Sequence, residues 1–430
     1  MRLVKRVWRN FRSLRDIAKE QGFVTACIQV LEKVRLHQEA KKRGSAAEGS
    51  GVVTPLMAKG QSIFLRVPWQ EAKSVDWGHD AYTPQCALRS AVPRVAWIMP
   101  PPDNGGGHQN IFRFVTYLHQ AGMVNDIYLS STFDRMTPAE ARRNVSSYCP
   151  VQDLTFVRFT PGMAIDADVI FATGWETVYD LASIDSPALK YYFVQDFEPF
   201  FYPVGTDYVL AENSYRMGYP AITAGRWLAH KLSEEYGMVC HPYDFGADKG
   251  RYFVTNRGTR KAVMFYARPA TERRGFPLGI LALELFHEMR PDVEIHLAGW
   301  DVRQWEISFP YVHHGSMKLD QLNDLYNRCA ASLVISLTNM SLLPLELLSS
   351  GVIPVVTQGD NNSMVSDNGY ISYCRVTPRA MAEALAAAVE SNERSELADA
   401  ASASVPSDTW DMAGAMLVRI LEDDLRTYGA

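Results

Sequence analysis

The sequence lacks several features that would place it in a class at once. No window of the 430 residues reaches about 18 consecutive apolar residues, which argues against a transmembrane helix. The six cysteines form no CxxC pair and none lies at zinc spacing from a histidine, so we predict no metal site and free, buried thiols in a reducing cytosol. The net charge of −5 excludes nucleic acid as a partner of the whole chain.

What is present indicates a soluble globular protein with more than one core. Hydrophobic residues make up 47% and charged residues 21% of the chain. A chain of 430 residues exceeds one ordinary core, so two domains are expected. The basic N-terminus is followed by no apolar run or cleavage site, so we predict no signal peptide and a cytoplasmic location, with the inner face of the cell membrane as a peripheral alternative.

The positive charge is concentrated at the N-terminus. Residues 1–45 hold twelve Lys or Arg against four acids, a net +8 that leaves −13 on the remainder. Apolar residues recur there at helical spacing, for example Val4, Trp8 and Phe11. Two interpretations have equal weight: the helix binds an anionic membrane surface, or it packs on the protein with a solvated basic face.

From Arg94 onward, buried-strand patterns alternate with helical ones, which predicts two doubly wound α/β domains in tandem. In the first series, "RVAWIMP", "DLTFVRF", "DADVIFATG" and "LKYYFVQD" are expected to be strands, and the second begins with "KAVMFYA". Residues 54–90 show little periodicity. The predicted parts are an N-terminal extension and linker (1–90), a first Rossmann-like domain (91–245), a second Rossmann-like domain (246–405) and a C-terminal helix (406–430) capped by Ser407 or Asp408.

Two arginines flank the first loop of the second domain. Arg268 follows a buried strand and Arg274 precedes the next helix. Open α/β sheets bind ligands at the carboxyl ends of their strands, where helix N-termini attract anions. Two guanidinium groups at that edge predict a pyrophosphate site that needs no metal. The alternative is that these arginines are ordinary surface charges near Glu272.

Further residues at the same edge extend this site. Glu346 lies in a short helix between two apolar strands, where its carboxylate can accept both hydroxyls of a ribose. The backbone around Leu345 can cap a phosphate, and Gly299 allows a flat base to approach the main chain.

These motifs together resemble those of a known family. "ARPATERRG", "LAGW" and "LPLELLSSGVIPVV" are similar to the nucleotide-sugar half of glycosyltransferase family 4, which has the GT-B fold. The run from Tyr191 to Gly237 resembles bacterial dTDP-rhamnosyltransferases of S-layer and surface-glycan assembly. The resemblance covers about residues 93–428 and implies a retaining, metal-independent transferase. The family often has a second glutamate eight residues before Glu346, where this chain has Thr338; Asn339 or backbone groups are the candidate substitutes for its sugar contacts.

The resemblance also suggests what the first domain contributes. Its glycine loop would face the donor, with Gly106 and Gly107 letting backbone N–H groups approach a phosphate or sugar. A dinucleotide fingerprint fits this loop poorly, because Asn110 stands where the third glycine is needed. His108 is expected either to reach the acceptor or to be structural.

Polar side chains follow the strand that ends near Val194. We predict acceptor contacts from Gln195, Asp196 and Glu198, and we take Asp196 as the group that touches the transferred sugar or the acceptor hydroxyl. Local capping or ion pairing is the alternative for the two acids.

The sequence thus predicts a transferase that moves a sugar onto a glycan or lipid-linked glycan acceptor. The resemblance implies that the sugar is L-rhamnose and that the donor is dTDP-rhamnose. Arg268 and Arg274 would stabilise the departing diphosphate. Two rivals are a non-catalytic carbohydrate-binding protein on the same fold, favoured by Thr338, and a nicotinamide oxidoreductase, disfavoured by the glycine spacing.

Overall fold

The structure is a computed structural model that describes residues 65–76, 82–86, 91–103, 105–130, 136–391 and 395–429. The predicted membrane-binding or packing helix in residues 1–45 lies outside these ranges. Within them, no helix combines the length and the hydrophobicity needed to cross a bilayer. The five cysteines among the described residues are free thiols.

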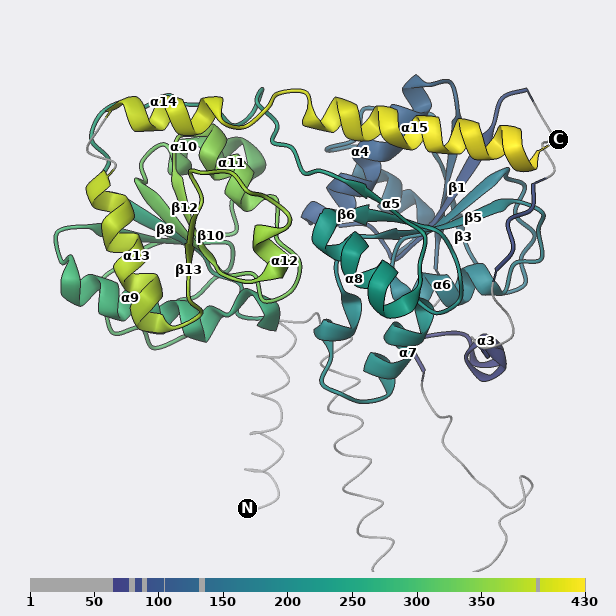
Figure 1. Cartoon of the computed structure of the whole chain (residues 1–430), viewed down its shortest axis with the longest axis horizontal. Coiled ribbons are helices and arrows are strands. Elements are labelled where there is room, and N and C mark those ends of the chain that lie inside the picture. The colour runs from purple at the N-terminus through teal and green to yellow at the C-terminus, as the bar shows by residue number, and fades with distance from the viewer. Residues whose placement is uncertain are drawn as a thin grey trace, which may run out of the picture. The chain divides into compact units, whose positions relative to one another are not determined.

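The first domain is built on a seven-stranded parallel sheet of order β3-β2-β1-β4-β5-β6-β7 (Figure 1). Its strands are β1 (Arg94–Met99), β2 (Val124–Leu129), β3 (Thr155–Arg158), β4 (Val169–Ala172), β5 (Leu189–Val194), β6 (Ala221–Ala224) and β7 (Cys240–Tyr243). Its helices are α3 (Trp69–Ser74), α4 (Gly106–Gln120), α5 (Pro138–Val145), α6 (Trp175–Ala182), η2 (Glu198–Phe201), α7 (Thr206–Ser214) and α8 (Arg226–Tyr236).

Strand β1 shows why this sheet is buried on both faces. Successive side chains of a strand point to opposite faces. Val95, Trp97 and Met99 join the core beneath α4 and α5, whereas Ala96 and Ile98 join a separate core beneath α6 and α7. A continuous apolar run is what a parallel strand covered on both faces requires.

The second domain is built on a six-stranded parallel sheet of order β10-β9-β8-β11-β12-β13. Its strands are β8 (Ala262–Tyr266), β9 (Glu294–Ala298), β10 (Val312–Gly315), β11 (Ala331–Val334), β12 (Ile353–Thr357) and β13 (Ser372–Cys374). Its helices are η3 (Glu272–Arg274), α9 (Phe276–Met289), α10 (Leu319–Tyr326), α11 (Leu343–Ser349), α12 (Asp360–Ser363), α13 (Pro378–Ser391) and α14 (Ser395–Ala403).

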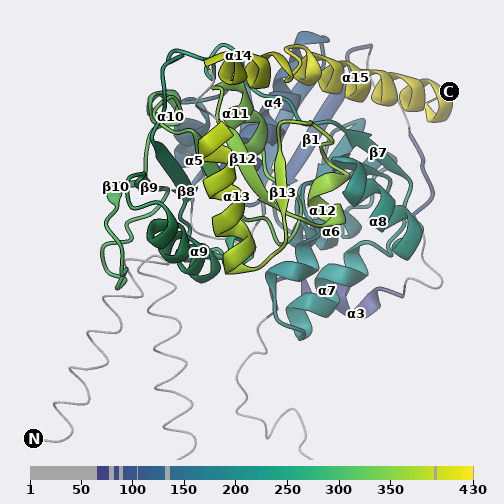
Figure 2. The same cartoon turned by 60° about the vertical axis from the view of Figure 1, so that its left-hand side comes forward.

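The final helix, α15 (Thr409–Tyr428), returns to the first domain and lies alongside α4, as Figures 1 and 2 both show. Tyr117 of α4 donates a hydrogen bond to Asp411 at 2.8 Å. Asp408 occupies the N-cap position of α15, but its side chain makes no capping hydrogen bond.

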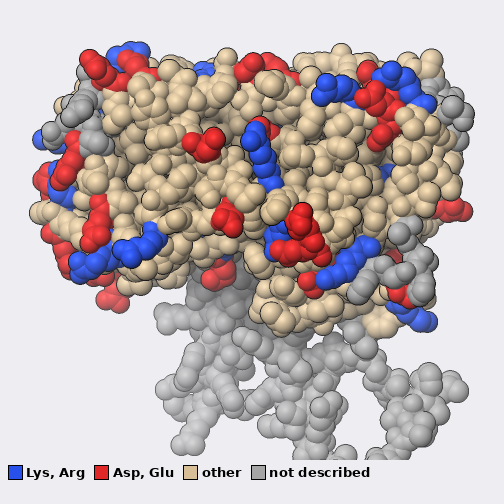
Figure 3. Space-filling model, in the orientation of Figure 1, with Lys and Arg blue, Asp and Glu red and all other residues tan. Residues whose placement is uncertain are grey.

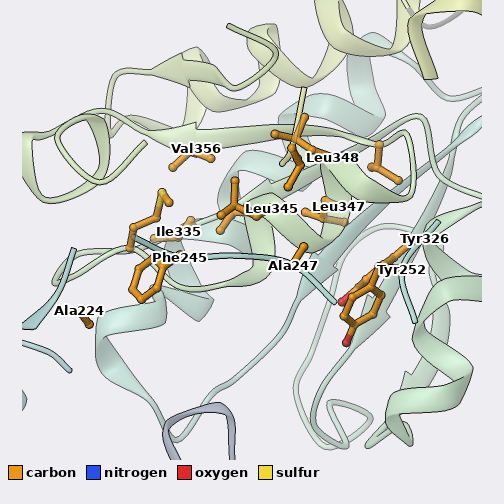
Figure 4. Close-up of a cluster of buried hydrophobic side chains, with 14 of the residues drawn as sticks. Ala224, Phe245, Ala247, Tyr252, Tyr326, Ile335, Leu345, Leu347, Leu348 and Val356 are labelled. Carbon is orange, nitrogen blue, oxygen red and sulfur yellow. The ribbon is translucent and has the colours of Figure 1, made fainter. Parts of the chain in front are cut away.

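One apolar cluster joins the two domains. It runs from Ala224 of the first sheet through Phe245 and Ala247 of the connecting segment to Leu345 and Val356 of the second domain (Figure 4). Burial of this shared surface favours an arrangement in which the carboxyl ends of the two sheets lie close together. On the face seen in Figure 3, acidic and basic side chains are interspersed among neutral surface.

Candidate functional site

Arg268 lies just beyond the carboxyl end of β8. Its Nη1 donates to the Tyr266 hydroxyl at 3.1 Å, and its guanidinium carbon lies 5.6 Å from the Tyr266 ring and 5.9 Å from the Trp300 ring. Its buried Nε has no hydrogen-bond partner within the described ranges. Two aromatic rings therefore hold a cation that still has unused donors.

Arg274 closes η3, directly before α9. It donates to the Ser336 hydroxyl, and burial lowers its pKa to about 10, so it remains a cation at neutral pH. Between them, Arg268 and Arg274 have no carboxylate within 4 Å in the part of the chain that the structure describes. Two cations without an ion pair at a helix N-terminus can receive a diphosphate.

The turn between these arginines and α9 depends on Gly275. Its φ of +55° lies in the left-handed region, and an added Cβ would meet Ile335 Cγ2 at 2.8 Å. A side chain here would displace either the helix N-terminus or the loop that follows β11.

Glu346 lies in the first turn of α11 and is half-buried. The Tyr326 hydroxyl donates to its Oε2 at 3.4 Å. Burial raises its pKa to about 7, while the charges of Arg251 and Arg113 act in the opposite direction. The neighbouring Leu345 side chain is buried, so its predicted contact with a phosphate is limited to its backbone.

Gly299 follows β9, and its surroundings give a structural reason for a glycine. Its φ is +117°, and an added Cβ would meet the Tyr266 ring at 2.7 Å and the Ala267 carbonyl at 3.0 Å. Close packing against Tyr266, which also binds Arg268, therefore explains why a glycine stands at this position.

The glycine loop of the first domain leads into α4, so Gly106 and Gly107 form its first turn. Gln195 donates from Nε2 to the Gly107 carbonyl at 3.1 Å, and its Oε1 accepts from Asn110 at 3.1 Å. Gln195 thus ties the end of β5 to the start of α4.

His108 is held by a neighbouring acid. Its Nδ1 lies 2.7 Å from Asp103 Oδ1, which also accepts from the Gly105 N–H at 2.7 Å. The hydrogen bond from His108 holds the pKa of Asp103 below its usual range, and the charge of Arg268 contributes in the same direction. Arg268 of the second domain thus acts electrostatically on Asp103 of the first domain.

Asp196 is 9% exposed and contacts the second domain directly. Its Oδ2 accepts from Thr338 Oγ1 and its Oδ1 from the Asn339 N–H, both at 2.8 Å. Arg273 Nε lies 3.4 Å from Oδ2. Asp196 is thus brought to the arginine-rich edge, but its contacts there are with protein groups.

Glu198 is placed in the interior of the first domain, at 7% exposure. Its Oε2 accepts from the Trp175 N–H at 2.6 Å, which satisfies a free donor at the start of α6. An acceptor contact was predicted for Glu198, but in this structure its carboxyl group is buried and bonded to the start of α6.

Three residues of this site are absent from the sequence-based prediction. Arg113 of α4 lies 4.5 Å from the Trp410 ring, and it contributes to the electrostatic environment of Glu346. A charge between the buried Phe112 and Phe114 was the signal that could have revealed it. Asp103 had no such signal, because its interaction with Arg268 joins positions far apart in the sequence. Tyr266 had none either, because its role depends on where its ring lies relative to Arg268.

The described residues contain no group of three His, Cys, Asp or Glu side chains able to hold a metal ion. Cations at this edge of the sheet include the side chains of Arg268, Arg273 and Arg274.

Two family models and one curated protein match parts of this chain. A family model described as "WsaF, C-terminal domain" matches residues 261–386, and one described as "WsaF, N-terminal domain" matches residues 157–224. The O-antigen biosynthesis protein RfbC of Myxococcus xanthus is 29% identical over 297 residues. That match covers 66% of this chain but 23% of RfbC, so the chain spans less than a quarter of the length of this relative.

Solved structures establish the architecture. A mutant of S. aureus TarM in complex with Fondaparinux, alpha-GlcNAc-glycerol and UDP superimposes with a TM-score of 0.57 at 10% identity, covering 79% of this chain and 100% of TarM. An alpha-glucosyltransferase in complex with UDP and a 13-mer DNA gives 0.52 at 11% identity, covering 78% and 100%. This chain has the GT-B fold. The predicted pair of doubly wound domains is therefore confirmed.

Proposed function

We propose that the protein transfers L-rhamnose from dTDP-rhamnose to a glycan or lipid-linked glycan acceptor during assembly of a bacterial surface polysaccharide, with retention of configuration and without metal. The observation that carries the donor part is the pair Arg268 and Arg274, two cations without an ion pair at the N-terminal end of α9. The similarity to WsaF domains and to RfbC supports the polysaccharide context. The sugar and the stereochemistry follow from the resemblance to rhamnosyltransferases.

The donor would lie along the edge of the second sheet. The two guanidinium groups would bind the diphosphate, Glu346 would accept from the ribose hydroxyls, and the backbone near Gly299 and Leu345 would border the nucleoside. As the sugar–phosphate bond breaks, negative charge grows on the diphosphate, and cations already in place stabilise it without reorganisation. No metal is then needed to neutralise the leaving group.

The first domain would supply the opposite wall. Gly106 and Gly107 present backbone N–H groups at the start of α4, and His108 lies beside Asp103, on which Arg268 acts electrostatically. Gln195 and Asp196 border the same space from the end of β5, although Asp196 is already bonded to protein and Glu198 supports α6 from within. Closing these walls over the donor excludes water and favours transfer over hydrolysis.

The basic segment of residues 1–45 would hold the enzyme at an anionic membrane surface, where a lipid-linked acceptor is available, on the cytoplasmic side. Deleting residues 1–45 should weaken binding to vesicles of anionic phospholipid. Unchanged binding would remove the membrane from the proposal and leave the transferase intact.

A thermal-shift panel tests the donor directly. Wild-type protein, Arg274→Ala, Arg268→Ala and the exposed control Arg303→Ala are melted with dTDP, UDP, GDP and their sugars in EDTA. A ligand at 100 times its Kd adds about 2.7 kcal/mol of stability. We expect dTDP-rhamnose to shift the wild type and the control but neither site variant. A preference for another nucleotide would overturn the rhamnose assignment, and an absence of any shift in folded protein would favour a non-catalytic carbohydrate-binding role.

Product analysis tests the reaction itself. Mass spectrometry detects the added deoxyhexose on an acceptor glycan, and NMR of the new anomeric centre distinguishes retention from inversion. Full activity in EDTA is expected, and activity that depends on added Mg²⁺ would contradict the arginine-based mechanism.

A further inference from the structure

A small set of buried polar contacts joins the two domains beside the donor arginines. Asp196 follows β5 in the first domain, and Thr338 and Asn339 follow β11 in the second. The Asp196 carboxylate accepts three hydrogen bonds, from Thr338 Oγ1 at 2.8 Å, from the Asn339 N–H at 2.8 Å and from the Phe197 N–H at 2.9 Å. Two of the three donors belong to the other domain, so these bonds form only when the domains meet.

The Asn339 side chain completes this junction in the opposite direction. Its Nδ2 donates to the Gln195 carbonyl at 3.0 Å and to the Ala224 carbonyl at 2.7 Å. Gln195 directly follows β5, and Ala224 is the last residue of β6. Thr338 and Asn339 are 2% and 1% exposed, so the junction is shielded from water, where hydrogen bonds are stronger and unpaired groups cost more.

The junction is continuous with the donor site. The Leu337 N–H donates to the Arg273 carbonyl at 3.1 Å, and the hydroxyl of Ser336 accepts from Arg274. Arg273 also lies 3.4 Å from Asp196 Oδ2 and 4.1 Å from the Phe201 ring. One loop, residues 336–339, thus holds a donor arginine at one end and binds the first domain at the other.

We propose that Asp196, Thr338 and Asn339 form an interdomain latch, and that Asp196 is a positioning residue that holds the first turn of α4 opposite Arg268. In this role the Asp196 carboxylate acts through Thr338 and Asn339 and does not touch the sugar. The latch is inferred from contacts alone, whereas its effect on transfer rests on the proposed function.

The latch has two separable consequences. Nucleoside diphosphate binds groups of the second domain, so its affinity should depend little on the latch. Transfer requires the first domain to be closed over the donor, so kcat should fall in proportion to the closed population. A broken latch should therefore lower kcat and raise the fraction of donor lost to hydrolysis, while the Kd for the diphosphate stays nearly constant.

The test uses the full chain with Thr338→Val, Thr338→Ser and Asp196→Asn. Valine removes the donor at constant volume, serine restores it, and asparagine keeps the shape of Asp196 without its charge. Thr116→Val, which removes a hydroxyl bonded within α4 at 2.8 Å, is the matched control. Hydrogen exchange of the Asn339 amide and the radius of gyration from X-ray scattering report on the latch without any substrate.

In Thr338→Val and Asp196→Asn, we expect the Asn339 amide hydrogen to exchange at least ten-fold faster than in the wild type and the radius of gyration to increase. We expect kcat to fall at least ten-fold in both variants. The Kd for dTDP should change less than three-fold, and Thr338→Ser should resemble the wild type. Unchanged exchange and radius in both variants would overturn the latch whatever the activity. Faster exchange in a protein whose wild type transfers no sugar would leave the latch standing and refute the proposed function.

Discussion

Replacing Glu198 by glutamine should change how the stability of the protein depends on pH. Glu198 and Glu176 are both buried around Gly174, where an added Cβ would lie 3.9 Å from Oε2 of Glu198 and 3.7 Å from Oε2 of Glu176. Burial, followed by the charge of Glu176, raises the pKa of Glu198 to about 8. Burial raises the pKa of Glu176 to about 7. Neither carboxyl group has a cation as its direct partner in the described structure.

The sign and size of the effect follow from linkage. A glutamate in the unfolded chain titrates near pH 4.3, so between that pH and about 8 the folded protein keeps a proton that the unfolded chain releases. The free energy of unfolding therefore falls as pH rises through this window and is constant again above it. One proton is worth about 1.4 kcal/mol per pH unit, so Glu198 alone accounts for a loss on the order of 4 kcal/mol from pH 5 to pH 8.

Glutamine removes this dependence while keeping the local contact. Its amide oxygen can accept from the Trp175 N–H, which now donates to Glu198 Oε2 at 2.6 Å. We expect Glu198→Gln to match the wild type at pH 5 and to exceed it in stability by several kcal/mol at pH 8.

Urea denaturation of the two proteins at pH 5, 6, 7 and 8 measures the difference, so that other titrating groups cancel. Glu234→Gln, at an exposed position of α8, controls for loss of one negative charge and should run parallel to the wild type. A stability difference between Glu198→Gln and the wild type that stays constant with pH would refute the reasoning, since it would mean that the two states bind the same number of protons.

Three further substitutions test other contacts. Arg260→Lys should lower stability by about 3 kcal/mol in urea denaturation, because the buried guanidinium donates to four backbone carbonyls that one ammonium cannot reach together; a loss under about 1 kcal/mol would contradict this. Gly414→Ala places a Cβ 2.3 Å from the Tyr117 ring and should lower the Tm through a cost of about 1–3 kcal/mol as α15 shifts from α4, whereas an unchanged Tm would mean that the helix contact is loose. Tyr326→Phe removes the hydroxyl that donates to Glu346 and should raise the pKa of Glu346 above its value of about 7. The pH below which the affinity for the nucleotide-sugar donor falls should then move upward. An unchanged pH dependence of that affinity would exclude Glu346 as a ribose ligand.

The sequence predicted those elements whose patterns are long and apolar. The helices from Gly106 and from Phe276 and the strands "RVAWIMP" and "LKYYFVQD" were expected and are present as α4, α9, β1 and β5. The missed strands are short or partly polar. β2 begins "VND", with Asn125 and Asp126 buried through specific partners, and a periodicity argument discounts such residues.

The site could be predicted only as far as it follows from topology. Arg268 and Arg274 lie at strand and helix ends, so their edge of the sheet could be inferred from the sequence alone. The burial of Glu198 could not, because its place depends on Gly174 and Trp175, whose segment packs against it only in the folded domain. The link between Asp196 and Thr338 spans 142 residues, and no local pattern encodes such a contact.

The residue at position 338 determines whether the negative charge beside the donor arginines comes from the first domain or from the second. In the family that the chain resembles, a glutamate often stands there, whereas this chain has a threonine whose hydroxyl lies 2.8 Å from Asp196 Oδ2. A glutamate at that position would bring a second carboxylate against the first in a buried site, where both cannot stay ionised. Asp196 and Thr338 are therefore a compatible pair, with the carboxylate from one domain and the donor from the other. The negative charge beside Arg273 and Arg274 is then present only while the domains are closed, whereas a glutamate at position 338 would supply it in either state.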